Sequence, residues 1–156
     1  MNAMKVILAV TGLTALLSAC STTPGTAGKV TYDNTIRKIV DARCSNCHGT
    51  AAPSMEEFKK DQDGYKAKNL GPRMDTYENL MVMVNGSDTG AIMRRLDDGA
   101  NTKENKPGNM YQYLGSSDAE RAANLALFKQ WIGGWSLKRA KDITEEEKKA
   151  VLAPRS

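Results

Sequence analysis

The chain has 156 residues, the size of one ordinary domain, and a formal net charge of +4. No cluster of lysine and arginine with interleaved aromatic residues accompanies this charge, so we expect no nucleic-acid partner. Removal of a leader that contains Lys5 leaves +3 from side chains, which predicts a surface of mixed sign.

Residues 1–19 are predicted to be a bacterial lipoprotein signal peptide. A short positive start, residues 1–5, precedes an apolar run over residues 6–16 that is too short to span a bilayer. Leu-Ser-Ala followed by Cys20 resembles a lipobox, in which the chain is cut before the cysteine and the cysteine is acylated. We therefore expect Cys20 to anchor a periplasm-facing or outer-membrane lipoprotein in the cell envelope. The alternative is an ordinary signal peptide in which Cys20 has no such role.

Three segments are expected after the cleavage site. Residues 20–29 are small and polar, which predicts a flexible tether with a reach of about 16 Å. Residues 30–135 are predicted to form the folded domain, and residues 136–156 a charged extension with a short helix. Of the three cysteines, Cys20 would carry lipid and the other two would form a pair. No unpaired thiol would then remain in an oxidising compartment.

Residues 44–48 have the sequence Cys-Ser-Asn-Cys-His, the attachment signature of c-type haem. Two thiols about one helical turn apart can each add to a haem vinyl group, and the histidine after the second thiol then lies beneath the iron. We predict one covalent haem c on Cys44 and Cys47, with His48 as the proximal iron ligand. A structural zinc site needs four ligands, and a thioredoxin-like pair needs a βαβ pattern that is missing here. A disulfide or another metal site is the remaining alternative.

The segments on either side of this motif differ in regularity. Ile36, Ile39 and Val40 have helical spacing, which predicts a helix over residues 31–43 that runs into the first cysteine. Residues 49–74 are rich in glycine, proline, lysine and aspartate and are predicted to form a long loop, with a turn of helix at residues 54–60.

The middle of the chain predicts short helices and a second loop. Asp75, with a glutamate three places on, predicts the start of a short buried helix that stops at Asn85 and the glycine after it. A second short helix is expected over residues 91–96. Residues 97–115 are too irregular for a helix, and an irregular segment of that length in a compact domain is usually functional.

The last part of the chain predicts two more helices. Ser117 and Glu120 form a capping-box pattern before an amphipathic helix that ends at a pair of glycines, Gly133 and its neighbour. Thr144 and Glu147 form another before a short helix to about residue 152. Such a short helix must dock on its own domain, dock on a partner, or fray. Since no strand pattern and no repeat is visible, the fold class is predicted to be all-α.

This order of elements resembles the monohaem c-type cytochromes of bacteria over about residues 30–135. Further matches are Ile39 and Val40 before the first cysteine, a Thr-Tyr-Glu helix start at residues 76–78 and an Arg-Arg-Leu segment at residues 94–96. The resemblance implies a cytochrome c-like fold, with several helices packed around one covalently bound haem. The mitochondrial-type pattern has a glycine in the first helix, and its absence here implies a different helix crossing.

The resemblance also implies a sixth iron ligand. His48 is the only histidine, so bis-histidine ligation within one subunit is excluded, and methionine sulfur is the leading candidate. Met110 lies in the irregular loop where the family carries its ligating methionine, although Tyr111 stands where the family has proline. Met74, which follows a Gly-Pro turn, is the alternative. The four remaining methionines are weaker candidates at core-like positions or close to the histidine: Met55, Met81, Met83 and Met93.

Three side groups are expected near the haem by the same resemblance. The carbonyl of Pro72 would accept the ring N–H of His48, unless this proline faces solvent. Trp131 and Tyr113 would lie against the porphyrin, unless they only pack in the core.

The resemblance implies electron transfer, with the iron cycling between Fe(II) and Fe(III), and no enzymatic activity. The protein would be a tethered shuttle or a subunit of a larger respiratory membrane complex, and its partners would be redox proteins. The alternatives are a haem enzyme or gas sensor with an open or weakly held sixth site, and an assembly subunit in which haem is structural.

Overall fold

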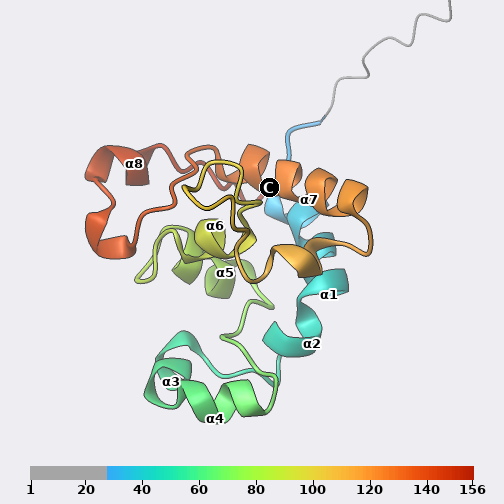
Figure 1. The fold of residues 1–156 in the computed structure, drawn as a ribbon, viewed down its shortest axis with the longest axis vertical. Helices are drawn as coiled ribbons and strands as arrows, with labels where there is room; N and C mark the ends of the chain where they lie inside the picture. Colours follow the sequence, from blue (N-terminus) through green and yellow to red (C-terminus); the bar gives the residue numbers. More distant parts are fainter. Residues whose placement is uncertain (1–27) are drawn as a thin grey trace, which may run out of the picture.

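The computed structural model describes residues 28–156, whose regular structure is helical apart from one isolated antiparallel bridge between Gly133 and Val151 (Figure 1). The predicted all-α class is confirmed. Among the residues that the structure describes, no helix is long and apolar enough to cross a membrane. The predicted signal peptide, Cys20 and most of the predicted tether lie outside the described residues.

The helices follow one another closely along the chain. In order they are η1 (Tyr32–Ile36), α1 (Arg37–Arg43), α2 (Ser45–His48), α3 (Met55–Lys60), α4 (Gln62–Ala67), α5 (Tyr77–Val84), α6 (Ala91–Leu96), η2 (Tyr111–Leu114), α7 (Asp118–Ile132), η3 (Ala140–Asp142) and α8 (Glu145–Lys149). In Figure 1, α7 lies at one end of the molecule and the pair α3 and α4 at the other.

The first predicted helix begins with a π-helical turn, η1. The carbonyl of Thr31 accepts hydrogen bonds from the N–H groups of both Thr35 and Ile36, each at 3.2 Å. Thr31 and Asn34 cap the turn reciprocally through side chain and backbone. The wider turn places Tyr32 and Ile36 in the core, where both are buried.

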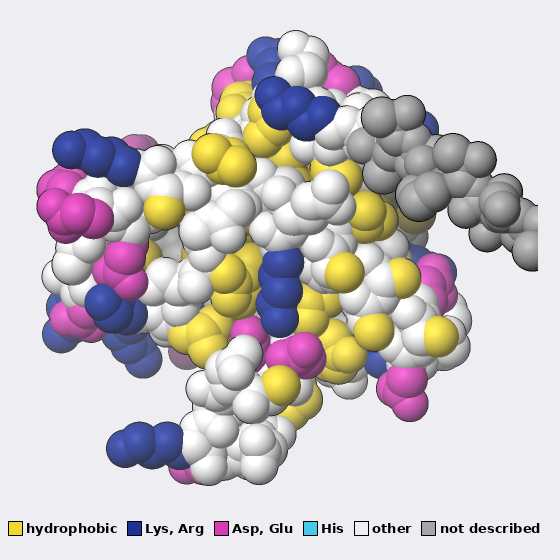
Figure 2. Space-filling model, turned by 90° about the horizontal axis from the view of Figure 1, so that it is seen from above, with side chains coloured by type: hydrophobic (Ala, Val, Ile, Leu, Met, Phe, Trp, Pro, Cys, Tyr) yellow, Lys and Arg dark blue, Asp and Glu magenta, His cyan; other side chains and the backbone are white. Residues whose placement is uncertain are grey.

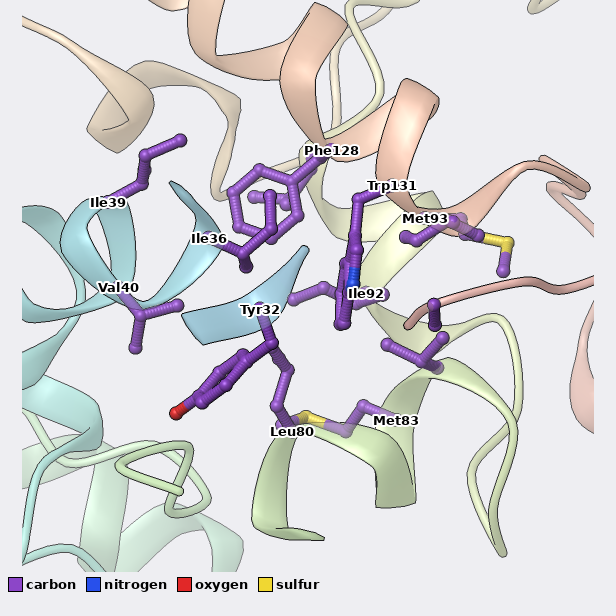
Figure 3. Packing of buried hydrophobic residues seen from close by; sticks show 14 of the residues in the cluster. Tyr32, Ile36, Ile39, Val40, Leu80, Met83, Ile92, Met93, Phe128 and Trp131 are labelled. Carbon is purple, nitrogen blue, oxygen red and sulfur yellow. The ribbon is translucent and has the colours of Figure 1, made fainter. Parts of the chain in front are cut away.

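The core is formed where η1 and α7 pack together, with α5 and α6 beneath them. Figure 3 shows Phe128 and Trp131 pointing from α7 toward Ile36 and Tyr32. The ring centroids of Tyr32 and Trp131 are 6.3 Å apart, and those of Phe128 and Trp131 are also 6.3 Å apart. Bulky side chains from both helices therefore fill the crossing at which the mitochondrial-type pattern has a glycine.

Two of the predicted helix caps differ from the structure. Thr76, not Asp75, caps α5, because Thr76 has extended backbone angles and its hydroxyl accepts from the N–H of Asn79 at 3.1 Å. At α7 the hydroxyl of Ser117 accepts from the N–H of Glu120 at 3.2 Å, but the carboxylate of Glu120 does not return to Ser117. The capping box of α8 forms as predicted, although the helix ends at Lys149.

The predicted loop over residues 49–74 contains two short helices, α3 and α4. Ser54 and Glu57 form a capping box for α3, and the carboxylate of Asp61 accepts from the N–H of Gly64 at 3.0 Å to cap α4. The expected turn of helix is therefore confirmed as α3, whereas α4 was not predicted. Its six residues are too few to show a hydrophobic period.

The C-terminal extension, residues 136–156, docks on its own domain. The N–H of Leu152 donates to the carbonyl of Ile132 at 2.8 Å, and that of Ala153 donates to the carbonyl of Trp131 at 3.0 Å. Ala153 is buried in the same core cluster as Trp131. The extension was expected to dock on its own domain, dock on a partner, or fray, and the structure shows that it docks on its own domain.

Candidate functional site

A cavity of about 340 Å³ lies between α2, the segment after α4, α6 and η2. Its wall is mostly apolar, and its volume is within the range of small-molecule and cofactor sites. Cys44, Cys47, His48, Met74 and Met110 all line it. The structure thus brings together the predicted haem-site residues, including the alternative methionine.

The short helix α2 places the two thiols and the imidazole on one turn. Cys44 ends α1 and precedes α2, and its carbonyl accepts from the N–H of Cys47 at 3.2 Å and from that of His48 at 2.9 Å. Neither cysteine is in a disulfide. Within residues 28–156, no group of three or more histidine, cysteine or carboxylate side chains is arranged to hold a metal ion.

Burial sets the protonation of Cys44 and His48 at the two ends of α2. It raises the pKa of the Cys44 thiol to about 11, with a smaller contribution from Cys47. A thiol with so high a pKa is protonated at neutral pH. Burial also lowers the pKa of His48; the hydrogen bond to Pro72 opposes this effect and the charge of Arg95 adds to it. The imidazole is therefore neutral, as a metal ligand must be.

One ring nitrogen of His48 is held and the other is left for a metal. Nδ1 lies 2.7 Å from the carbonyl oxygen of Pro72. Since a carbonyl only accepts, Nδ1 carries the proton and Nε2 keeps its lone pair. The expected contact with Pro72 is confirmed.

Gly71 lies against this imidazole, and its role was not predicted. A Cβ atom at this position would overlap Cε1 of His48, so only glycine fits while the ring keeps its place. The N–H of Gly71 donates to the carbonyl of Cys47 at 2.9 Å, and that of Met74 donates to the carbonyl of His48 at 2.8 Å. The Gly-Pro pair was a visible signal of a turn, but not of this contact.

The loop that carries Met110 folds back on the end of α6. The N–H of Met110 donates to the carbonyl of Arg95 at 2.9 Å, and that of Gly108 donates to the carbonyl of Asp97 at 2.8 Å. These bonds use carbonyls that the end of a helix leaves free. Gly108 fits so closely that a Cβ atom would overlap the carbonyl oxygens of Arg94 and Arg95.

Asp97 is a buried carboxylate at the start of this loop, and sequence analysis did not single it out. One carboxylate oxygen accepts from the N–H of Gly99 at 2.8 Å, and the other accepts from the indole N–H of Trp135 at 3.1 Å. It thus ties the loop to the segment after α7. No local sequence pattern could have revealed this contact, because Asp97 and Trp135 are 38 residues apart.

The other methionine and aromatic candidates differ in whether they line the cavity. Of the weaker methionine candidates only Met83 lines the cavity. Trp131 is fully buried in the core and does not line it, whereas Tyr113 does and is 57% exposed. Core packing, the alternative for Trp131, is therefore what the structure shows.

Comparison with known proteins gives the family. The sequence profile of a family described as PccH cytochrome c matches residues 31–152. The chain belongs to this cytochrome c family. It is also similar to a solved structure, the monohaem cytochrome PccH from Geobacter sulfurreducens, with 49% sequence identity and a TM-score of 0.75 over 81% of this chain and 99% of that one. No curated protein matches the chain.

Family membership confirms the predicted monohaem c-type cytochrome and its cytochrome c-like fold. It implies electron transfer and one haem c. The family match extends through α8 and so includes most of the C-terminal extension.

The charged side chains that line the cavity of this cytochrome are all positive. They are Arg43, Lys66 and Arg95, and no aspartate or glutamate joins them in the cavity wall. Arg95 donates to the side-chain oxygen of Asn109 at 2.8 Å, while Lys66 is 3.5 Å from Asp63 in an exposed pair. The cavity therefore suits an apolar group that carries negative charge at its edge.

Proposed function

We propose that this cytochrome binds haem c covalently through Cys44 and Cys47 and works as an electron carrier. When bound, haem c supplies a one-electron Fe(III)/Fe(II) couple. The observation that carries the proposal is the α2 turn: both thiols line the apolar cavity, and His48 has Nδ1 bonded to Pro72 and Nε2 free for iron.

The residues present fit such a group. A porphyrin needs an apolar cavity, and its two propionates need cations or hydrogen-bond donors at the edge. The cavity offers apolar walls together with Arg43, Lys66 and Arg95. Gly71 packs closely on the imidazole and, with the carbonyl of Pro72, holds His48 in place.

Met110 is proposed as the sixth ligand, with Met74 as the alternative. The backbone of Met74 is bonded to the carbonyl of His48 itself, so this residue belongs to the segment that holds the proximal ligand. Met110 comes from a separate segment, packed on the end of α6. A side chain from that segment can approach the cavity without disturbing the support of His48.

An electron carrier fits the cavity better than an enzyme or gas sensor. Acid–base catalysis next to a haem needs a distal proton donor or acceptor. Among the described residues that line the cavity there is no carboxylate, and the only histidine is used by the proximal side. With Met110 bound, no coordination position would be left for substrate.

The location and partners are part of the same proposal. Cys20 would carry an acyl anchor, residues 20–29 would tether the domain to the cell envelope, and redox proteins would be its partners. The protein would then be a shuttle or a subunit of a respiratory membrane complex. No nucleic acid is proposed as a partner, because positive and negative side chains alternate over the face shown in Figure 2.

The test is the haem content of the mature protein, made in a host that matures c-type cytochromes. After acid–acetone extraction, intact mass should retain one haem, and Cys44→Ala or Cys47→Ala should leave little stable holoprotein. Cys20→Ala is the matched control, since it should keep the haem and lose membrane association. Loss of all haem from the wild type on extraction would contradict covalent attachment. Rapid carbon monoxide binding by the reduced wild type would instead favour an open sixth site.

A further inference from the structure

We infer that Arg43 is a positioning residue for Met110, acting through Ser116 and Glu120 at the end of the methionine loop. The inference rests on the proposed ligation by Met110. The side chain of Arg43 bonds to Ser116 and Glu120 and not to Met110, so its effect would pass through the loop.

The three residues form a closed group of hydrogen bonds, which we call the Arg43 clamp. The guanidinium donates to the hydroxyl of Ser116 at 3.2 Å and pairs with one carboxylate oxygen of Glu120. The other carboxylate oxygen accepts from the backbone N–H of Ser116 at 2.7 Å. This second bond is the reason why the predicted capping box at Ser117 is only half formed.

The clamp joins two walls of the cavity. Arg43 is the last residue of α1 and directly precedes Cys44, whereas Ser116 ends the segment that follows Met110. Within residues 28–156, the bonds made by Arg43 are the only side-chain hydrogen bonds between the segment 31–48 and the segment 97–132. The polar connection between the cysteine side and the methionine side thus depends on one guanidinium.

The segment between Met110 and the clamp is short, and besides the clamp α7 holds it through Asn124 and through Arg121, which donates to the carbonyl of Gly115 at 3.1 Å. The N–H of Tyr113 donates to the carbonyl of Met110 at 3.0 Å, and Asn124 of α7 donates to the carbonyl of Leu114 at 2.6 Å. Leu114 is buried and lines the cavity. Loss of the clamp would remove one of these anchors, so η2 and the methionine before it would be held less firmly.

The clamp is shielded enough for its bonds to matter. The side chains of Arg43 and Glu120 are 31% and 36% exposed. A fully exposed ion pair contributes little, but a guanidinium with several charge-assisted bonds in one geometry holds its partners more firmly. For comparison, Arg37 and Asp41 on the same helix lie 3.7 Å apart with side chains 60% and 58% exposed.

Arg43 also lines the cavity, so its charge alone would act on a haem. The two effects differ in sign. If charge alone matters, removing the positive charge of Arg43 lowers the reduction potential, and removing the negative charge of Glu120 raises it. If positioning matters, both changes loosen the sulfur–iron bond.

The test compares holoprotein variants Arg43→Gln and Glu120→Gln with the controls Arg37→Gln and Asp41→Asn. The measurements are the weak far-red band of sulfur-ligated ferric haem, its loss with rising pH, the reduction potential and carbon monoxide binding. Both clamp variants should weaken the band, lower the pH at which it disappears and bind carbon monoxide about tenfold faster, the size expected for one lost hydrogen bond to a charged group. The controls should match the wild type.

Two further variants keep the test decisive if Arg43→Gln fails to fold. Ser116→Ala removes one bond without changing charge and should shift the same readouts in the same direction by less. Arg43→Lys keeps the charge but loses the planar fork, so it should resemble Arg43→Gln if positioning matters and the wild type if charge alone matters.

Three results would overturn the inference. Opposite shifts of potential with an unchanged band would mean that Arg43 acts by charge only. If both clamp variants behave like the wild type while Met110→Ala abolishes the band, the positioning role of Arg43 is wrong but ligation by Met110 is supported. If the band survives Met110→Ala, Met110 is not the sixth ligand, and the inference about Arg43 is wrong as well.

Discussion

Two segments support the cavity in different ways. The histidine wall, residues 44–48 and 71–74, is held by backbone hydrogen bonds and by the contact between Gly71 and His48. The methionine wall, residues 95–116, is held by backbone bonds to the end of α6 and by side chains from α7, the segment after α7 and the Arg43 clamp. The proximal ligand is thus supported mainly by backbone groups, whereas the proposed distal ligand depends to a larger extent on side chains. We expect the methionine wall to open first when the protein is perturbed.

The largest effect should come from Gly71→Ala. Its Cβ would overlap the imidazole of His48, and the backbone bond to Cys47 leaves this segment little freedom to move. We expect loss of most holoprotein, measured as haem per polypeptide. Gly28→Ala is the control, because nothing lies within 4 Å of a Cβ there. A normal haem content in Gly71→Ala would show that the histidine wall is less rigid than its packing indicates.

Gly108→Ala should come next and should damage the other wall. A Cβ there would meet the carbonyls of Arg94 and Arg95, at a cost of about 1–3 kcal/mol in the free energy of unfolding. Haem should remain attached, while the far-red sulfur band is lost and carbon monoxide binds. Denaturant unfolding and the spectra of ferric and reduced protein measure these effects. Loss of haem in this variant would show that damage to the methionine wall also disturbs the histidine wall.

Met110→Ala should change the spectrum more than the stability. Met110 is only half-buried, so its removal creates a small cavity, but it would leave the iron without its sulfur ligand and lower the reduction potential. Met74→Ala is the matched comparison: Met74 is 5% exposed, and its truncation should cost about 2–5 kcal/mol while the band remains. If Met74→Ala loses the band and Met110→Ala keeps it, the sixth ligand is Met74.

The smallest effect should appear in acid. The backbone N–H of Ser116, and then Arg43, hold the pKa of Glu120 below its ordinary value of 4.5. A carboxylate with a lowered folded pKa contributes stability that is present above the unfolded pKa and lost as pH falls through the folded one. The sulfur band should therefore weaken progressively below about pH 4.5, and Glu120→Gln should lack this component. Identical acid titrations of the variant and the wild type would contradict it.

Local sequence was enough to predict much of this protein. The haem motif, the amphipathic pattern of α7 and the cap at Thr144 each depend on residues within one or two helical turns, so their spacing alone is informative. The methionine loop was predictable for the same reason up to Met110, because its glycine, proline and asparagine residues disfavour a helix; the expectation of no helix over residues 97–115 was wrong for the 3₁₀ turn η2 at its end. The cap of α5 was predicted one residue early, because Asp75 and Thr76 both offer a capping side chain and backbone geometry chooses between them. Ser117 caps α7 as predicted, but the carboxylate of Glu120 bonds to the N–H of Ser116 in place of Ser117.

Only the tertiary structure decided the contacts between distant segments. Gly71 and His48 are 23 positions apart, Asp97 and Trp135 are 38 apart, and Arg43 and Glu120 are 77 apart, so no periodic pattern connects them. The same holds for the docking of the C-terminal extension on Trp131 and Ile132. Sequence spacing reports which side chains share one helix face, whereas the packing of buried surface determines which faces meet.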